Sequence, residues 1–239
     1  MVRTYFSSFL LFLTLVFFSN CSRDAIDGTG PNVIENRIGL RNFDALTLES
    51  NCDVRLIQSP QYRVEVEGFE SLMPFVETFV TQGVLVIRLD PNFRYRHNNI
   101  IIRVFAPDVW EITNASSGKI CTDNWHNFKN ELRVVNSGSG DVILKGDADV
   151  AKVTISGSGE VELDGDGTEL HATLTGSGNL FAFDFDVSEA NVQVTGSGDA
   201  EIDVSRLLEA WVSGSGDVIY EGSPRVVSTV SGSGQVLRR

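Results

Sequence analysis

The feature that most constrains the fold is a tetrapeptide, Ser/Thr-Gly-Ser-Gly, that occurs six times in the C-terminal half of the chain. Its first glycine is found at Gly138, Gly157, Gly176, Gly196, Gly214 and Gly232. Successive copies are therefore 19, 19, 20, 18 and 18 residues apart. A period of this length, sustained over six copies, is typical of a solenoid in which each repeat forms one coil and stacks on its neighbours.

Apolar residues recur at fixed distances from these tetrapeptides. Val153 and Ile155 precede one copy, Val161 and Leu163 follow it, and the residues between are mostly polar. This alternation is typical of a strand with one buried face. The buried column before the corner is predicted to contain Val135, Ile155, Leu174, Val194, Val212 and Val230. The buried column after the corner is predicted to contain Val142, Val161, Leu180, Ala200, Val218 and Val236.

The pattern predicts an all-β fold, a parallel β-helix (β-solenoid) with coils of 18–20 residues and Gly-Ser-Gly corners. Each coil is predicted to contain two short strands joined at the corner, followed by a variable polar loop such as 145–149 or 164–168. Glycine suits the corner because it adopts backbone angles that other residues avoid and lets neighbouring coils pack closely. Helices are excluded here, because glycine pairs and β-branched residues are poor helix formers.

The N-terminal half contains a blurred form of the same repeat. Leu46 and Leu48 align with Val153 and Ile155, so residues 43–56 are predicted to form a degenerate first coil. Blurring is expected of terminal coils that cap a stack. A second degenerate corner is predicted within 111–120, and further strands at 62–67, 84–90 and 99–105, while 71–81 fits either a strand or a short helix. Residues 39–239 are assigned to a single β-helix domain.

The first 20 residues have the pattern of an export signal. One charge at Arg3 precedes an apolar run at 9–18 that is too short to span a bilayer comfortably. Cys21 follows, as in bacterial lipoprotein signals, where the cysteine becomes the lipidated N-terminus; a plain secretory signal cut nearby is the alternative. The lipoprotein interpretation predicts a membrane anchor at Cys21, a flexible tether over 21–38 and a location in the cell envelope, as an outer-membrane lipoprotein.

Two thiols remain in the chain after the proposed anchor, at Cys52 and Cys121. An exported protein enters an oxidising compartment that permits a disulfide. The intervening strands are expected to keep the two Cα atoms farther apart than the limit of about 7 Å for a disulfide. We therefore expect two free, buried thiols.

Composition limits the classes of function. The net charge of −13 excludes nucleic acid as a partner, because phosphate contacts need a basic face. The serines of the tetrapeptide repeat with every coil, whereas a catalytic nucleophile is a single residue beside a base. His97, His126 and His171 lie in different regions without the spacing of metal ligands. No catalytic residue, cofactor or metal site is therefore predicted.

The position after each corner is polar and mostly acidic. It is occupied by Asp141, Glu160, Asn179, Asp199, Asp217 and Gln235. One interpretation is that each side chain caps backbone amides near the corner. The other is a weak site for Ca²⁺ or a cationic partner, since hard cations bind carboxylate oxygens. Capping is favoured, because the Gly-Gly-x-Gly-x-Asp motif of calcium-binding solenoids is absent.

Exposed aromatic and basic residues are the candidate surface contacts. Trp211 lies on the outward side of the strand that buries Val212, where its ring either stacks on a sugar or covers a neighbouring coil. Arg94, Tyr95 and Arg96, with His97, form the one basic and aromatic cluster of an acidic chain, which suits an anionic glycan or is an ordinary loop. The remaining aromatic candidates are Phe93, Trp110 and Trp125.

The chain resembles the head GIN domain family of putative auto-transporter adhesins. The residues that carry the resemblance are 42–46, 53–58, 64–68, 82–87 and the Gly-Ser-Gly-Asp-Val coils, and the match spans about 39–236. The resemblance implies a β-helix fold and lipoproteins of Bacteroidetes-type bacteria. The adhesin name of that family is itself inferred from fold, so the resemblance implies an architecture more firmly than an activity.

Two functions from different classes fit the sequence. The first is a non-enzymatic, envelope-anchored β-helix that presents a surface for adhesion or for a protein or glycan partner. The second is a carbohydrate-active β-helix enzyme, a polysaccharide lyase or hydrolase, which needs acidic or basic groups that converge in a cleft. The loops predicted between coils are short, so the first function is favoured. A glycan array together with a polysaccharide degradation assay separates the two.

Overall fold

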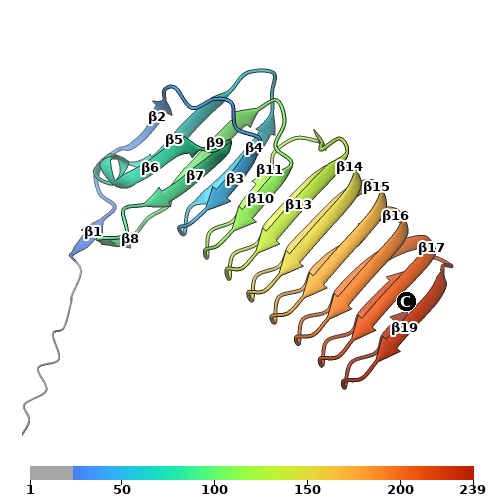
Figure 1. Cartoon of the computed structure of the whole chain (residues 1–239). Helices are drawn as coiled ribbons and strands as arrows, with labels where there is room; N and C mark the ends of the chain where they lie inside the picture. Colours follow the sequence, from blue (N-terminus) through green and yellow to red (C-terminus); the bar gives the residue numbers. More distant parts are fainter. Residues whose placement is uncertain (1–23) are drawn as a thin grey trace, which may run out of the picture.

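The structure is a computed structural model that describes residues 24–239, and it is almost entirely β-structure (Figure 1). The N-terminal part contains β1 (Ala25–Asp27), β2 (Asn32–Arg37), β3 (Ala45–Leu48), β4 (Asp53–Gln58), β5 (Arg63–Phe69), the 3-10 helix η1 (Glu70–Phe75), β6 (Val76–Thr81), β7 (Val84–Leu89), β8 (Arg94–Arg96) and β9 (Ile101–Ala106). The stack continues with β10 (Glu111–Asn114), β11 (Ile120–Thr122), β12 (His126–Asn127), β13 (Glu131–Asn136), β14 (Val142–Ile155), β15 (Val161–Leu174), β16 (Leu180–Val194), β17 (Ala200–Val212), β18 (Val218–Glu221), β19 (Arg225–Val230) and β20 (Val236–Arg238).

The C-terminal half is the predicted solenoid of parallel coils. β14 to β17 lie side by side in Figure 1 and pair parallel along almost their whole length, so that Val142 pairs with Val161 and Ile155 with Leu174. Residues 145–149 and 164–168, predicted as loops, lie inside β14 and β15. That prediction was wrong because the ladder continues where the chain turns back, with Lys145 paired to Asp164. We call this turn, opposite the Gly-Ser-Gly corner, the arch.

The column before the corner is buried through its centre, as predicted for Ile155, Leu174, Val194 and Val212. Its two ends differ from the prediction. Asn136, not Val135, pairs with Ile155, and its buried side-chain amide donates to the Gly140 carbonyl at 2.8 Å. Val230 is 46% exposed, because within residues 24–239 no further coil covers it.

The corner glycines are required for close packing. None of them has a positive φ; the glycines with positive φ among the described residues lie elsewhere. A Cβ added at Gly196 would lie 1.9 Å from the carbonyl oxygen of Gly176, and the same clash recurs at Gly214 against Gly196. The predicted need for unusual backbone angles at the corner was therefore wrong, and the predicted close approach of coils is confirmed.

The N-terminal half contains the two degenerate coils predicted from the sequence. β10 pairs parallel with both β3 and β13, which places Leu48 beside Asn114 in the column that continues through Asn136 to Ile155. Residues 71–81 contain both predicted alternatives, since η1 leads directly into β6. The predicted strands at 62–67, 84–90 and 99–105 are β5, β7 and β9. β5 pairs antiparallel with β2 and β9, and β6 pairs antiparallel with β7, so antiparallel strands close this end of the stack.

The tether predicted over 21–38 was wrong where β1 and β2 lie, within the described part of that segment. β1 pairs with β8, and β2 pairs with β5 along all six of its residues. Backbone pairing holds β2, whose side chains are mostly exposed and whose two apolar residues, Val33 and Ile34, are adjacent and do not alternate. The predicted signal segment, 1–20, and Cys21 lie outside the described residues. Among residues 24–239, no helix is long and apolar enough to cross a membrane.

Candidate binding surfaces

The polar row after the corners caps the backbone of the next coil. Asp199 Oδ1 accepts the backbone N–H of Asp217 at 2.7 Å, and Asp217 Oδ1 accepts that of Gln235 at 2.7 Å. Asn179 and Asp141 make the same contact to Asp199 and Glu160. Four of the six side chains in the row therefore satisfy a donor at the coil edge, which confirms the capping interpretation for Asp141, Asn179, Asp199 and Asp217. The described residues contain no group of three or more His, Cys, Asp or Glu side chains placed to hold a metal ion.

Trp211 lies on the outer face of the sheet formed by the strands before the corner. Its neighbours across the ladder are Gln193 and Thr229, and 41% of its surface is exposed. The alternation of β17 buries Ala210 and Val212 on either side of it, so the indole points away from the core. The ring therefore lies open on the sheet surface, as the sequence pattern predicts.

A small hollow of about 70 Å³ lies on the same sheet close to Trp211. Its polar lining comes from neighbouring strands and consists of Glu169, His171, Glu189, Asn191 and Glu209. Glu209 is two residues before Trp211 on β17 and therefore shares its face. We call Trp211, Gln193, Asn191, His171 and Glu209 the tryptophan face. It joins an open aromatic ring to amide, imidazole and carboxylate groups on a flat, rigid support.

Tyr95 is a packing residue of the N-terminal end. Its hydroxyl donates to the Asp90 carbonyl at 2.9 Å, and its ring packs edge-on against Phe75. Burial, followed by the charge of Asp90, raises the pKa of Tyr95 to about 12. Its ring and hydroxyl therefore take part in packing at this end of the domain, and its role as a surface contact stays a prediction.

Arg94 and Arg96 flank Tyr95 on β8 and are exposed, as predicted. Neither forms an ion pair with any other residue of the 24–239 range. His97 contacts Asp27 at 2.7 Å beside them. β8 pairs with β1 at the N-terminal end, whereas Trp211 belongs to β17 far along the stack (Figure 1). The predicted contact residues therefore form two separate surfaces.

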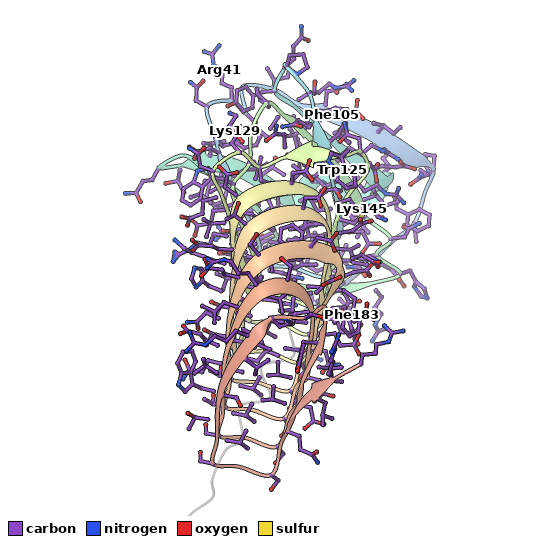
Figure 2. All side chains as sticks on the ribbon, turned by 90° about the vertical axis from the view of Figure 1, so that its right-hand side faces the viewer. Arg41, Phe105, Trp125, Lys129, Lys145 and Phe183 are labelled. Carbon is purple, nitrogen blue, oxygen red and sulfur yellow. The ribbon has the colours of Figure 1, made fainter. Side chains whose placement is uncertain are left out.

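The arches present an acidic ladder that the sequence interpretation missed. Asp166 pairs with Asp186, Asp186 with Asp203, and Asp203 with Glu221. Asp147 extends the row, because its Oδ1 accepts the backbone N–H of Asp166 at 3.1 Å. Figure 2 shows the arches of successive coils one behind another, with Trp125 close by. Trp125 is 51% exposed and donates its indole N–H to Asp147 Oδ2 at 3.1 Å.

Two adjoining hollows of about 550 and 440 Å³ run along this ladder and share Asp166 and Gly167. Burial raises the pKa of Asp203, and the charges of Asp186 and Glu221 raise it further. The sequence signal for the ladder was an aspartate nine residues after Gly138 and again after Gly157, at Asp147 and Asp166. The later coils do not keep this nine-residue spacing. The reason is that β16 is longer than β15 and β17, and its register shifts against both neighbours.

The cysteines and histidines are separate structural residues. Cys52 and Cys121 are free, as predicted, but only Cys52 is buried, while Cys121 is half-buried. Burial raises the pKa of the Cys52 thiol to about 11, so it stays protonated and unreactive at neutral pH. His126 is buried in a stack on Phe128, and burial lowers its pKa, whereas His171 lies on the sheet surface beside Glu169.

Several solved structures share this fold. A putative adhesin from Bacteroides fragilis is 18% identical with a TM-score of 0.82, over 90% of this chain and 100% of that chain. A putative lipid binding protein from Parabacteroides distasonis is 23% identical with a TM-score of 0.75, over 90% and 100%. A putative adhesin from Parabacteroides merdae is 23% identical with a TM-score of 0.72, over 90% and 99%. At these identities the likeness shows the fold alone.

The family comparison covers most of the domain. No curated protein matches the chain. The family model described as putative auto-transporter adhesin, head GIN domain, matches residues 42–224, which is more than half of the sequence and includes both degenerate coils and most of the regular ones. The chain belongs to the family of putative auto-transporter adhesins with a head GIN domain.

Proposed function

We propose that this protein is a non-enzymatic, envelope-anchored adhesin that binds a neutral glycan on the tryptophan face. The observation that carries the proposal is the open ring of Trp211 among Gln193, Asn191 and Glu209 on one rigid sheet. A pyranose ring stacks its C–H face on such an aromatic ring, and its hydroxyls donate to carboxylate and amide oxygens. The net charge of −13 disfavours an anionic glycan.

The position of the tryptophan face along the stack supports presentation away from a membrane. β1 begins four residues after Cys21, so an anchor at Cys21 is close to the N-terminal end of the domain. The column from Leu48 runs through Asn114, Asn136, Ile155, Leu174 and Val194 to Val212, one coil at each step. With about 4.8 Å per step, Trp211 lies roughly 29 Å along the stack from β3.

The glycan proposal predicts that Trp211→Ala weakens binding on an array of neutral glycans. The loss of ring stacking is expected to weaken affinity about tenfold or more, since about 1.4 kcal/mol corresponds to a factor of ten. Trp125→Ala is the matched control, because Trp125 is also exposed but lies beside the arches. Equal binding by wild type and Trp211→Ala, or loss only in Trp125→Ala, would contradict the assignment of this face.

The proposed lipid anchor at Cys21 predicts a loss of membrane association when this cysteine is replaced. Cys21→Ala removes the only atom to which the lipid can attach, so the protein is expected to move from the membrane fraction to the soluble fraction of the cell envelope. Fractionation followed by immunoblotting measures the change. Cys121→Ser is the matched control, because that thiol is half-buried within the domain. Retention of Cys21→Ala in membranes would show that another contact holds the protein there.

A carbohydrate-active enzyme is the second candidate, and one observation favours it. Asp203 has a raised pKa and lies beside Asp186 in a hollow of about 440 Å³, as a general acid beside a carboxylate would. Parallel stacking by itself sets this separation, however, and repeats it along the whole ladder, so the spacing does not single out a catalytic pair. Release of reducing sugar by wild type but not by Asp203→Asn would favour the enzyme.

A further inference from the structure

The last coil exposes apolar residues, and two of them stand at positions that the preceding coils bury. Eight large apolar side chains are exposed in residues 24–239, and four of them belong to this coil. They are Val226, Val227, Val230 and Leu237. Val226 and Val230 continue the buried positions of Leu208 and Val212, and all six residues of β19 are exposed. Val227 and Leu237 instead continue the outward positions of Glu209 and Ile219. The end of the stack therefore presents an uncovered slice through the core.

The same end presents unpaired strand edges. Inside the stack, the Val212 carbonyl accepts the N–H of Ser231, and the Gly214 carbonyl accepts that of Ser233. The Val218 N–H donates to the Gln235 carbonyl on the other sheet. The equivalent groups of Val230, Gly232 and Val236 have no further coil to bond within the described residues. An open edge of this kind is a template for pairing with another strand.

The opposite end of the stack is closed. β9 has β4 on one side and the antiparallel β5 on the other, while β7 has β3 and the antiparallel β6. The outer edges of the parallel strands β7 and β9 are therefore covered by antiparallel strands. The outermost strands at this end, β2 and β6, each pair on one side only, and they belong to antiparallel pairs and not to a regular coil. Within the described residues, a coil that matches the last coil of a second copy is therefore found at the C-terminal end.

We propose that this open end binds the same end of a second copy of the chain, related by a two-fold axis. The coil presents two edges, β19 and β20, which run in opposite directions on two sheets about 10 Å apart. An occupant must match both edges and the apolar slice between them, and another copy of this coil does so. A two-fold axis perpendicular to the stack makes the contact isologous and closed, and it pairs the strands antiparallel.

The Gly-Ser-Gly corner of the last coil decides whether β19 pairs with the partner's β20 or with the partner's β19. The carbonyl of Gly214 points along the stack toward the last coil, so that of Gly232 points out of the open end. Pairing β19 with the partner's β20 would set the two corners together, carbonyl against carbonyl. When β19 pairs antiparallel with the partner's β19, the partner's coil runs in the opposite direction. Each corner then lies against the partner's arch. The second arrangement avoids the repulsion and is the one we propose.

The register of this pairing follows from the backbone. Alternate residues direct their N–H and C=O groups to the same side, so Val226, Ser228 and Val230 share the open edge. Centring the antiparallel pair on Ser228 sets Val226 opposite the partner's Val230. Both apolar residues are then covered, and Ser228 lies on the two-fold axis beside the partner's Ser228.

The oligomeric state of residues 22–239, which include every described residue, tests the proposal by sedimentation across the micromolar range. Wild type is expected to be a dimer that dissociates on dilution. Val230→Glu places a carboxylate against the partner's Val226 and is expected to weaken the dimer about tenfold or more. Val226→Lys together with Val230→Glu sets opposite charges across both pairs and is expected to restore it. A wild type that stays monomeric, or that forms open-ended oligomers, would overturn the proposal.

A cross-link tests the register without relying on those variants. Cα atoms of a hydrogen-bonded antiparallel pair are about 5.5 Å apart, within the disulfide range. Ser228→Cys is therefore expected to oxidise to a covalent dimer with unchanged melting behaviour. Ser156→Cys, on an exposed corner inside the stack, is the matched control and should form no covalent dimer. Equal cross-linking by the two variants, or none in Ser228→Cys, would exclude this interface.

Discussion

Val194→Asp is expected to lower the free energy of unfolding by about 4 kcal/mol or more, a large part of the 5–15 kcal/mol typical of a domain. Val194 is fully buried, with Leu174 on one side and Val212 on the other. An aspartate there either brings an unpaired charge into an apolar column or stays protonated with unsatisfied oxygens. Because each coil contacts only its neighbours, the substitution is expected to divide the stack at this coil.

Thermal melting and amide hydrogen exchange measure the two effects separately. The midpoint is expected to fall by about 10 °C or more, and protection is expected to fall first in β16 and β17. Gln193→Asp is the matched control, because Gln193 is the exposed neighbour on the same strand. Its effect is expected to stay within about 0.5 kcal/mol. Equal melting of wild type and Val194→Asp would contradict the buried column.

The repeat allowed most of the fold to be predicted from the sequence, because the fold satisfies the same local constraints in every coil. Glycines that admit the next coil recur with the period, and apolar residues alternate around them, so Leu174 and Val194 are located by counting. The same counting placed Leu46 and Leu48 in a degenerate coil, and the register confirms it. The prediction was correct where one coil resembles the next.

Two of the wrong predictions concern residues whose place is set by hydrogen bonds and not by burial of apolar side chains. Asn136 was passed over for Val135 because a buried asparagine looks polar until its bond to the Gly140 carbonyl is known. β2 was taken for tether because its pairing with β5 leaves no alternating apolar pattern. The missed interactions are hydrogen bonds, which composition and periodicity do not report.

Some features of the candidate surfaces could also be predicted from the sequence, whereas others could not. The outward direction of Trp211 follows from its position next to Val212, so the sequence sufficed. The packing of Tyr95 depends on Phe75 and Asp90, which reach it only in the folded end of the stack. The acidic ladder depends on register shifts in β16 that align Asp186 with Asp203 despite unequal coil lengths.

Gly196→Ala is expected to destabilise the protein by about 3 kcal/mol or more, although it adds a single methyl group. The added Cβ would lie 1.9 Å from the carbonyl oxygen of Gly176 in the preceding coil. That oxygen belongs to the backbone and accepts the N–H of Ser197 at 3.0 Å, so relief of the clash requires the two coils to separate at the corner. Separation breaks this bond and loosens the apolar column beside it.

Two control variants separate the steric clash expected in Gly196→Ala from the cost of placing alanine at a glycine position. Ser197→Ala changes the exposed neighbour in the same corner and is expected to alter the free energy of unfolding by less than about 0.5 kcal/mol. Gly39→Ala adds a Cβ where nothing lies within 4 Å but φ is +84°, so it measures the conformational cost alone, about 1 kcal/mol. Chemical denaturation measures the free energy of unfolding of the three variants and ranks their destabilisation. If Gly196→Ala cost no more than Gly39→Ala, the corner would relax without separating the coils, and close backbone approach would not explain the repeated glycine.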